Sequence, residues 1–263
     1  MNKLFVFDLD NTLIDTTHNY DKSIVDAAMH IVTALGSNAP HVSKIIEMIM
    51  SADENMAFQS NPTTGKSYGY SMERFPSALR ETYRDICRHS KIVPNHEIEQ
   101  EIYDIGMAAF DARRYYENIR PYAVELIQFL KRQYDFVVLC TKGDERVQRN
   151  KIIALIHAGL KSIDEFNGIY VVPDKTSKVF RSIKEKYRNT VKSYNTYSVS
   201  SNSYTADIEP ALKSDYDDFK GIFIPLETWN NRRYMAEYLS WARISGTKIF
   251  HSLRDIEYNY DKL

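Results

Sequence analysis

The hydrophobic and polar positions divide the chain into two kinds of region. Residues 4–7 are a short apolar run, Leu-Phe-Val-Phe, made of residues that favour strands, and polar residues follow directly. This pattern predicts a buried strand. From residue 19 to about residue 116 the apolar positions recur instead at helical spacing, which predicts helices over residues 19–35, 42–50, 71–90 and 95–116. Residues 55–70, rich in Asn, Ser, Gly, Thr and Tyr, interrupt them as a long loop.

The pattern changes at residue 120, after which helical and strand patterns alternate. Strands are expected at residues 136–140, 168–172, 196–200 and 221–225, and helices at residues 121–133, 145–158, 177–188 and 208–214. Such alternation indicates βαβ units and a parallel sheet. We therefore predict an α/β fold, a Rossmann-like doubly wound parallel sheet formed by residues 1–15 and 120–263, with an all-α domain inserted over residues 16–119.

Composition and cysteine spacing argue against a nucleic-acid-binding protein, a membrane protein, a zinc site and a disulfide framework. The chain has 263 residues, 43% hydrophobic and 26% charged, which is typical of a globular protein, and its net charge of −1 gives no reason to expect nucleic acid or a membrane as a partner. Cys87 and Cys140 lie far apart without metal-ligand spacing. No stretch has the pattern of a signal peptide or a membrane span, so we expect a cytoplasmic protein.

Candidate chemistry lies where the predicted strands end. Asp8 and Asp10 follow the first strand, and because side chains alternate along an extended chain, both point the same way. In open parallel sheets ligands bind beyond the carboxyl ends of the strands. Two neighbouring carboxylates repel unless a cation or a shared proton compensates them, and Mg²⁺ prefers such oxygen ligands. An isolated Asp-x-Asp is also typical of a simple polar turn.

Further polar groups follow the later strands and would share that edge of the sheet. These are Thr141 and Lys142, then Lys175, then Ser201, Asn202 and Ser203 with Asp207 beyond. Together the segments supply a carboxylate nucleophile, a second carboxylate for proton transfer, a hydroxyl and an ammonium for phosphate oxygens, and oxygen ligands for a metal. Such a set indicates phosphoryl transfer.

At this point the chain resembles the haloacid dehalogenase superfamily. Its pattern is D-x-D-x-T, then Thr or Ser after a strand, then Lys, then an acidic cluster, and all four occur here in order. Residues 140–144 and 201–211 look like those of phosphatase-type members, and the insertion looks like a helical cap of the type that closes over small substrates.

The resemblance implies roles for individual residues. Asp8 would attack phosphorus, Asp10 would act as acid and then base, and Thr141 and Lys175 would hold and neutralise the phosphoryl group. Lys142 is expected to be a solvated neighbour first and a substrate contact second. Lys178 competes with Lys175, but Lys175 matches the family pattern better.

Magnesium would be held by Asp8, Asp10, Asn202 and Asp207. Asn202 stands where many members carry an acid, which implies a retained but weaker metal site, because an amide oxygen ligates Mg²⁺ without charge. The alternative is that Asn202 only forms a turn and catalysis has been lost.

Asp10 distinguishes reactions within the superfamily, since true haloacid dehalogenases lack this second acid. The predicted function is a Mg²⁺-dependent phosphomonoesterase that works through an aspartyl phosphate on a small cytosolic phosphate ester. A nucleoside 5′-monophosphate is favoured because Phe58, Tyr68 and Tyr70 could stack a base, although these rings could equally pack the cap against the core.

Three alternatives stay open. They are a sugar-phosphate or phosphoglycolate phosphatase, a non-catalytic module that binds a nucleotide or protein, and a nucleic-acid end phosphatase. The size of the insertion and the lack of a clustered basic run argue against the last. The oligomeric state does not follow from the sequence.

Overall fold

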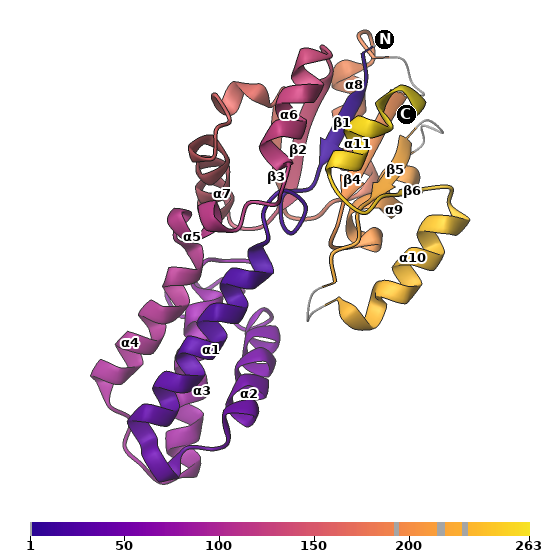
Figure 1. Ribbon diagram of the computed structural model, residues 1–263. Coiled ribbons are helices and arrows are strands. Elements are labelled where there is room, and N and C mark those ends of the chain that lie inside the picture. The colour runs from indigo at the N-terminus through magenta and orange to yellow at the C-terminus, as the bar shows by residue number, and fades with distance from the viewer. Residues whose placement is uncertain (1, 192–194, 215–218, 228–230) are drawn as a thin grey trace. The chain divides into compact units, whose positions relative to one another are not determined.

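The computed structural model describes residues 2–191, 195–214, 219–227 and 231–263 (Figure 1). The chain forms two compact units. The first consists of residues 1–16, 116–143 and 151–263, and the second of residues 17–115 and 144–150. The first unit thus joins the two ends of the chain around the segment that the sequence predicts as an insertion.

A parallel sheet forms the centre of the first unit. In the described part of the chain its strand order is β3-β2-β1-β4-β5-β6, and every neighbouring pair is parallel. The strands are β1 (Leu4–Phe7), β2 (Phe136–Lys142), β3 (Gly168–Val172), β4 (Thr196–Ser200), β5 (Phe219–Phe223) and β6 (Lys248–Ile249). The order runs outward from β1 in both directions, so the predicted doubly wound α/β fold is confirmed.

Strand β1 is central because it is apolar on both faces. Its residues are almost completely buried, and Phe7 lies in register with Leu139 of β2 and Val199 of β4. Phe5 stacks against Tyr197 on one face of the sheet. Because parallel strands end at one edge, the residues that follow β1, β2 and β4 come together there.

Helices cover both faces of this sheet. They are α6 (Ala123–Arg132), α7 (Glu145–His157), α8 (Ser177–Tyr187), α9 (Glu209–Leu212), α10 (Met235–Ile244) and α11 (Arg254–Tyr258). Phe180 of α8 and Ala211 of α9 pack with Leu4 and Val6 on one face. Figure 1 shows α6 and α11 on the other side, toward the viewer. Helix α7 begins among residues of the second unit and ends in the first.

The structure corrects the predicted bounds near β5. The strand begins at Phe219 rather than at Gly221, and it ends before Pro225. Gly221 lies inside the strand. A glycine is needed there because a Cβ would come within 2.4 Å of the Thr247 hydroxyl and 2.7 Å of the Ile208 side chain. The sequence pattern predicts the start of a strand at this glycine, whereas the structure shows a close approach of neighbouring side chains. The short strand β6 was not predicted.

The second unit is built from helices. They are α1 (Thr16–Leu35), α2 (Val42–Met56), α3 (Arg74–His89), α4 (His96–Met107) and α5 (Ala112–Glu117). Tyr20, Phe75 and Phe110 meet edge to face and join α1 to α3 and to the turn after α4. Helices α3 and α4 approach closely at Gly106, where a Cβ would lie 2.7 Å from the backbone of Pro76.

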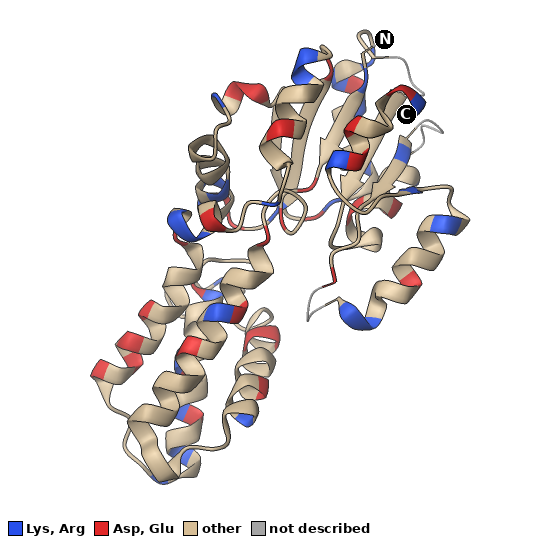
Figure 2. Ribbon diagram, in the orientation of Figure 1, with Lys and Arg blue, Asp and Glu red and all other residues tan. Residues whose placement is uncertain are grey.

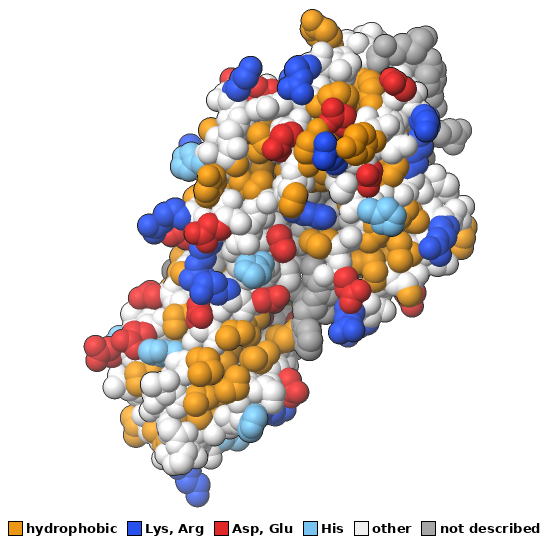
Figure 3. All heavy atoms as spheres, viewed as in Figure 1, with side chains coloured by type: hydrophobic (Ala, Val, Ile, Leu, Met, Phe, Trp, Pro, Cys, Tyr) orange, Lys and Arg blue, Asp and Glu red, His pale blue; other side chains and the backbone are white. Residues whose placement is uncertain are grey.

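Surfaces of both units mix apolar and charged side chains, as the face drawn in Figure 3 shows. On α1, Val25 and Met29 are about half exposed. Within the described ranges, every helix is too short or too polar to cross a membrane.

Helix α4 carries four acidic side chains, Glu97, Glu99, Glu101 and Asp104, and Figure 2 shows red segments along it. One of them, Glu99, is buried and accepts two hydrogen bonds of 2.8 Å from the Arg84 guanidinium on α3. This hydrogen-bonded partner lowers the pKa of Glu99 below its ordinary value of 4.5. The pair therefore links α3 to α4 most strongly when Glu99 is ionised.

Replacing Glu99 by Gln is expected to lower the free energy of unfolding by about 1–2 kcal/mol at pH 7, because the charge-assisted pair is lost. A carboxyl whose pKa is depressed on folding stabilises the fold above its unfolded pKa, and this contribution is lost as the pH falls through the lower folded pKa. The difference between E99Q and wild type should therefore shrink below about pH 4.5. Urea unfolding at pH 7 and pH 4 measures it. E97Q, at an exposed position of the same helix turn, is the control, and an equal loss in both variants would contradict the pair's role.

Candidate active site

The turn after β1 is held in one conformation by local hydrogen bonds. The Asp8 amide donates to the Val199 carbonyl at 3.0 Å and so extends β1 by one residue. Asn11 adopts a left-handed conformation with φ of 59°, which Asn tolerates better than most residues. Its side-chain oxygen accepts from the Thr16 amide at 3.0 Å, and its carbonyl accepts from Arg120 at 2.8 Å. The turn therefore presents Asp8 and Asp10 from a fixed backbone.

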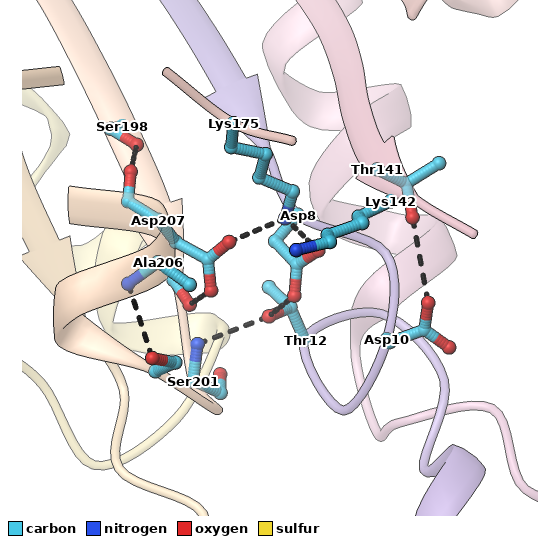
Figure 4. Close-up of polar contacts among 12 residues, drawn as sticks. Asp8, Asp10, Thr12, Thr141, Lys142, Lys175, Ser198, Ser201, Ala206 and Asp207 are labelled. Carbon is cyan, nitrogen blue, oxygen red and sulfur yellow. Dashed lines mark hydrogen bonds and ion pairs between the residues drawn. The ribbon is translucent and has the colours of Figure 1, made fainter. Parts of the chain in front are cut away.

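Asp8 is buried and has a partner on each carboxylate oxygen (Figure 4). Lys175 Nζ donates to Oδ1 at 2.5 Å, and the Thr12 hydroxyl donates to Oδ2 at 3.0 Å. The Thr12 oxygen in turn accepts from the Ser201 amide at 3.0 Å. Thr12 therefore ties the nucleophile predicted on β1 to the segment that follows β4.

Lys175 lies between Asp8 and a second buried carboxylate, Asp207, and forms an ion pair with both. Asp207 is in the π-helical turn Tyr204–Ile208 that follows β4. Its Oδ2 accepts from the Ser200 hydroxyl at 2.6 Å, and its backbone carbonyl accepts from the Ser198 hydroxyl at 2.9 Å. Three strand ends thus contribute to one charged cluster.

Asp10 is held by a different ammonium group. Its Oδ1 forms an ion pair with Lys151 of α7, and its Oδ2 accepts from the Thr141 hydroxyl at 3.4 Å. The Lys151 side chain is 3% exposed, whereas that of Asp10 is 24% exposed. A lysine is rarely buried to this extent unless its charge is paired.

The pKa values report the charge balance of the cluster. Burial, together with the Asp207 charge, raises the pKa of Asp8 to about 7, although Lys175 opposes the change. Burial alone would also raise the pKa of Asp10, but the charge and hydrogen bond of Lys151 outweigh it and lower that pKa. The pKa of Lys175 rises, because Asp207 and Asp8 outweigh the effect of burial. The cluster therefore opposes the ionisation of Asp8 and favours that of Asp10.

We tested whether these residues fit a divalent cation. In the ranges that the structure describes, no three His, Cys, Asp or Glu side chains converge as a metal site. The donor set nevertheless suits a hard cation, because the three carboxylates exceed the two ammonium groups of Lys151 and Lys175 by one charge, and because the predicted fourth ligand, Asn202, offers an amide oxygen. That oxygen accepts from Asn231 Nδ2 at 3.2 Å.

The predicted substrate-binding residues fall into both units. Thr141 is fully buried beside Asp10, and Lys142 forms an ion pair with Asp174 at 3.0 Å. In the second unit, Tyr68 is buried with Met56 and Ala78, which leaves little of its ring for stacking on a base. The ring packs within the second unit, whereas the alternative interpretation has it pack the cap against the core.

Tyr70, the other predicted stacking residue, has an exposed side chain, and Phe58 is exposed as well. The Arg74 guanidinium lies 5.8 Å from the centroid of the Tyr70 ring. Arg74 also donates to both carboxylate oxygens of Asp53 and to the Gly69 carbonyl. The structure leaves Tyr70 and Phe58 accessible to a ligand.

Lys151 is the main site residue that the sequence analysis missed. The signal was present, because Val147, Lys151 and Leu155 are four residues apart and lie on the buried side of α7. A lysine within an otherwise apolar helical stripe needs a buried anionic partner. Thr12 was seen only as part of the D-x-D-x-T pattern, without its contact to Asp8.

The haloacid dehalogenase-like hydrolase family model matches residues 2–199 of this sequence. The chain belongs to that family. No curated relative matches the sequence.

Solved structures share the fold of this hydrolase. A proposed β-phosphoglucomutase from Thermotoga maritima is similar with a TM-score of 0.59 at 14% identity, over 99% of each chain. The L-2-haloacid dehalogenase from Xanthobacter autotrophicus, with chloropropionic acid covalently bound, gives 0.51 at 15% identity, also over 99% of each chain. A proposed haloacid dehalogenase-like hydrolase from Bacillus subtilis bound to magnesium gives 0.50 at 18% identity, over 85% of this chain and 89% of that one. At these identities the likeness concerns the fold.

Replacing Lys175 by Met is expected to lower the free energy of unfolding by about 3–5 kcal/mol at neutral pH, because Asp8 and Asp207 would then repel each other without a buried cation between them. K178M removes an exposed lysine from the next helix and should change it by less than about 0.5 kcal/mol. Urea unfolding in EDTA measures both. Similar values for the two variants would show that Lys175 does not compensate the carboxylates.

Proposed function

We propose that this hydrolase is a Mg²⁺-dependent phosphomonoesterase that acts through an aspartyl phosphate on a small phosphate ester. The observation that carries the proposal is Asp10, a second acid near the nucleophile Asp8, held at both carboxylate oxygens by Lys151 and Thr141. The remaining elements of the site serve either a phosphate or a halide reaction.

Asp10 matters because the two reactions differ in their leaving groups. A halide is a weak base and departs without a proton, so carbon–halogen cleavage by a carboxylate needs no acid. The oxygen of a phosphate ester departs as a strongly basic alkoxide unless an acid protonates it. A positioned carboxyl beside Asp8 therefore favours phosphate esters.

In the first half of the proposed reaction, one carboxylate oxygen of Asp8 attacks phosphorus and the bond from phosphorus to the ester oxygen breaks. Asp10 gives its proton to that oxygen, and the product is an alcohol and an aspartyl phosphate. An incoming phosphate favours the protonated form of Asp10, since a like charge raises the pKa of a carboxyl. Lys175, already beside Asp8, neutralises the charge that develops on the phosphoryl oxygens.

In the second half, the ionised Asp10 takes a proton from water, and the water oxygen attacks phosphorus. The bond between phosphorus and Asp8 breaks, which releases inorganic phosphate and restores the Asp8 carboxylate. The Thr141 hydroxyl and backbone would orient the phosphoryl group throughout. Lys151 keeps the pKa of Asp10 low in the free protein, which suits a base.

Magnesium would be held by Asp8, Asp10, Asn202 and Asp207. When bound, the ion would neutralise negative charge on the phosphoryl oxygens and on the surplus carboxylate. The donor set supports this proposal, because oxygen ligands with excess negative charge suit a hard cation.

For the substrate we propose a small phosphate ester, with a nucleoside 5′-monophosphate as the first candidate. The exposed rings of Phe58 and Tyr70 support it, since either could stack on a base. Tyr68 adds little to this support, because its ring is buried in the second unit. A sugar phosphate or phosphoglycolate would use the same Asp8 and Lys175 chemistry and is the second candidate.

Hydrolysis of 4-nitrophenyl phosphate in the presence of Mg²⁺ tests the reaction. We expect turnover by the 263-residue chain, a loss of more than about 10³-fold on replacing Asp8 by Asn, and abolition by EDTA. D164N, an exposed aspartate in the same unit, is the matched control and should retain wild-type activity. Nucleotides and sugar phosphates then identify the substrate.

Release of chloride from 2-chloropropionate is measured in parallel. Dehalogenation that depends on Asp8, without phosphate release from any ester, would overturn the proposal in favour of a dehalogenase. Absence of both activities across a panel of divalent metals would favour a non-catalytic binding module.

Replacing Asn202 by Asp is expected to lower the Mg²⁺ concentration for half-maximal activity about tenfold, because the new carboxylate adds charge to the ligand set. The fold should tolerate the change, since the Asn202 oxygen accepts from Asn231 and a carboxylate oxygen can accept in its place. Activity and melting temperature titrated against Mg²⁺ provide two measurements. N38D, at an exposed position, is the control. An unchanged Mg²⁺ requirement would remove Asn202 from the proposed ligand set.

A further inference from the structure

Lys151 is the least expected charged group of the site. It belongs to α7, near the middle of the helix, on the side that also buries Ile152 and Leu155. Such a position ordinarily carries an apolar residue, because removing an ammonium group from water is unfavourable unless a counter-charge is close. The counter-charge is Asp10.

Two of the contacts of the Asp10 carboxylate come from the same part of the chain, whereas Thr16 contributes another from α1. Lys151 contacts Oδ1, and the Thr141 hydroxyl contacts Oδ2. Thr141 lies near the end of β2, and Lys151 lies on α7, the helix that follows this strand. One strand–helix unit therefore fixes the plane of a carboxyl that is carried by the turn after β1.

Orientation is critical for a group that transfers protons, because the proton must reach the ester oxygen or leave the water along a short, aligned path. The Lys151 side chain is almost completely enclosed, so it is not placed to bind a substrate directly. The Asp10 side chain is the more exposed partner, at 24% against 3% for Lys151. These observations separate the two roles.

We propose that Lys151 is a positioning residue: it holds Oδ1 of Asp10 and so fixes the orientation in which this carboxyl acts on the substrate. This inference rests on the proposed phosphatase function. It assigns to Lys151 no contact with the substrate.

The first test is a double-mutant cycle with K151M, which keeps most of the length of the side chain and removes its charge. K151M is expected to lower kcat by about 10–100-fold with less than a twofold change in KM. D10N should lower kcat by about 10²–10⁴-fold. In the D10N background, K151M should have less than about a twofold further effect, because the group that it positions is already absent.

A merely structural role for Lys151 predicts a different result. General damage to the first unit would lower kcat by the same factor in the wild-type and D10N backgrounds, and that outcome would overturn the proposal. K161M, at an exposed position beyond α7, is the matched control and should leave kcat unchanged. K151R restores the charge and should recover part of the kcat lost in K151M.

A second measurement does not depend on turnover. Crystal structures of wild type and K151M are expected to show the Asp10 carboxylate in different rotamers, and an unchanged rotamer would overturn the proposal even if no phosphate ester is hydrolysed. Melting temperatures confirm that the variants fold: D10N and K151M should each melt below wild type, and the double variant should recover much of the loss, since neither charge is then left unpaired. If wild type lacks activity, the phosphatase proposal fails while the crystal structures still decide the role of Lys151.

Discussion

The arrangement of the site depends on the pairing of three carboxylates with two enclosed lysines. Lys175 stands between Asp8 and Asp207, and Lys151 pairs with Asp10. The groups arrive from separate segments, and their charges would be strongly unfavourable at this depth without these partners. The two lysines come from a loop and from α7. The Thr12 and Ser200 hydroxyl groups donate further hydrogen bonds, to Asp8 and Asp207 respectively.

Parallel strands make this pairing possible. Since β1, β2 and β4 are in register at the centre of the sheet, their ends lie at one edge, and each of the following turns needs to carry only one or two polar residues. The apolar β1 run sets the depth of Asp8, whose amide extends the ladder to Val199. Burial is therefore a consequence of the strand's composition, and the raised pKa of Asp8 follows from it together with Asp207.

The difference between local features and contacts that are distant in sequence explains what the sequence could predict. Strand ends are local features, so the predicted bounds of β1, β3 and β4 match the structure, and Asp8, Thr141, Lys175 and Asp207 could be placed at one edge by topology alone. Lys151 could not be found in this way, because it comes from within a helix and its partner is 141 residues away. Recognising it requires knowing which side of α7 is buried.

Tyr68 and Gly221 also show that local sequence does not reveal distant neighbours. Here the sequence pattern predicts a role that the packed structure does not support. An aromatic residue in a polar loop looks available for ligand stacking, but Tyr68 fills a space between Met56 and Ala78 that only the packed helices create. Gly221 resembles a strand boundary in the sequence. In the structure, a glycine is required there because a side chain would collide with Thr247, which lies later in the chain. In both cases the deciding atom belongs to a neighbour that local sequence does not reveal.

The neutral residue at position 202 is consistent with this charge balance. Ser201, the preceding residue, is joined to Asp8 through Thr12, so a carboxylate at Asn202 would add a second uncompensated negative charge to the same cluster. The pKa of Asp8 is already about 7, and another nearby anion would raise it further in the absence of a cation. An amide at this position offers a ligand oxygen without that penalty. In the proposed reaction, a weaker hold on Mg²⁺ would thus accompany an Asp8 carboxyl that stays closer to its ionised form when the ion is absent.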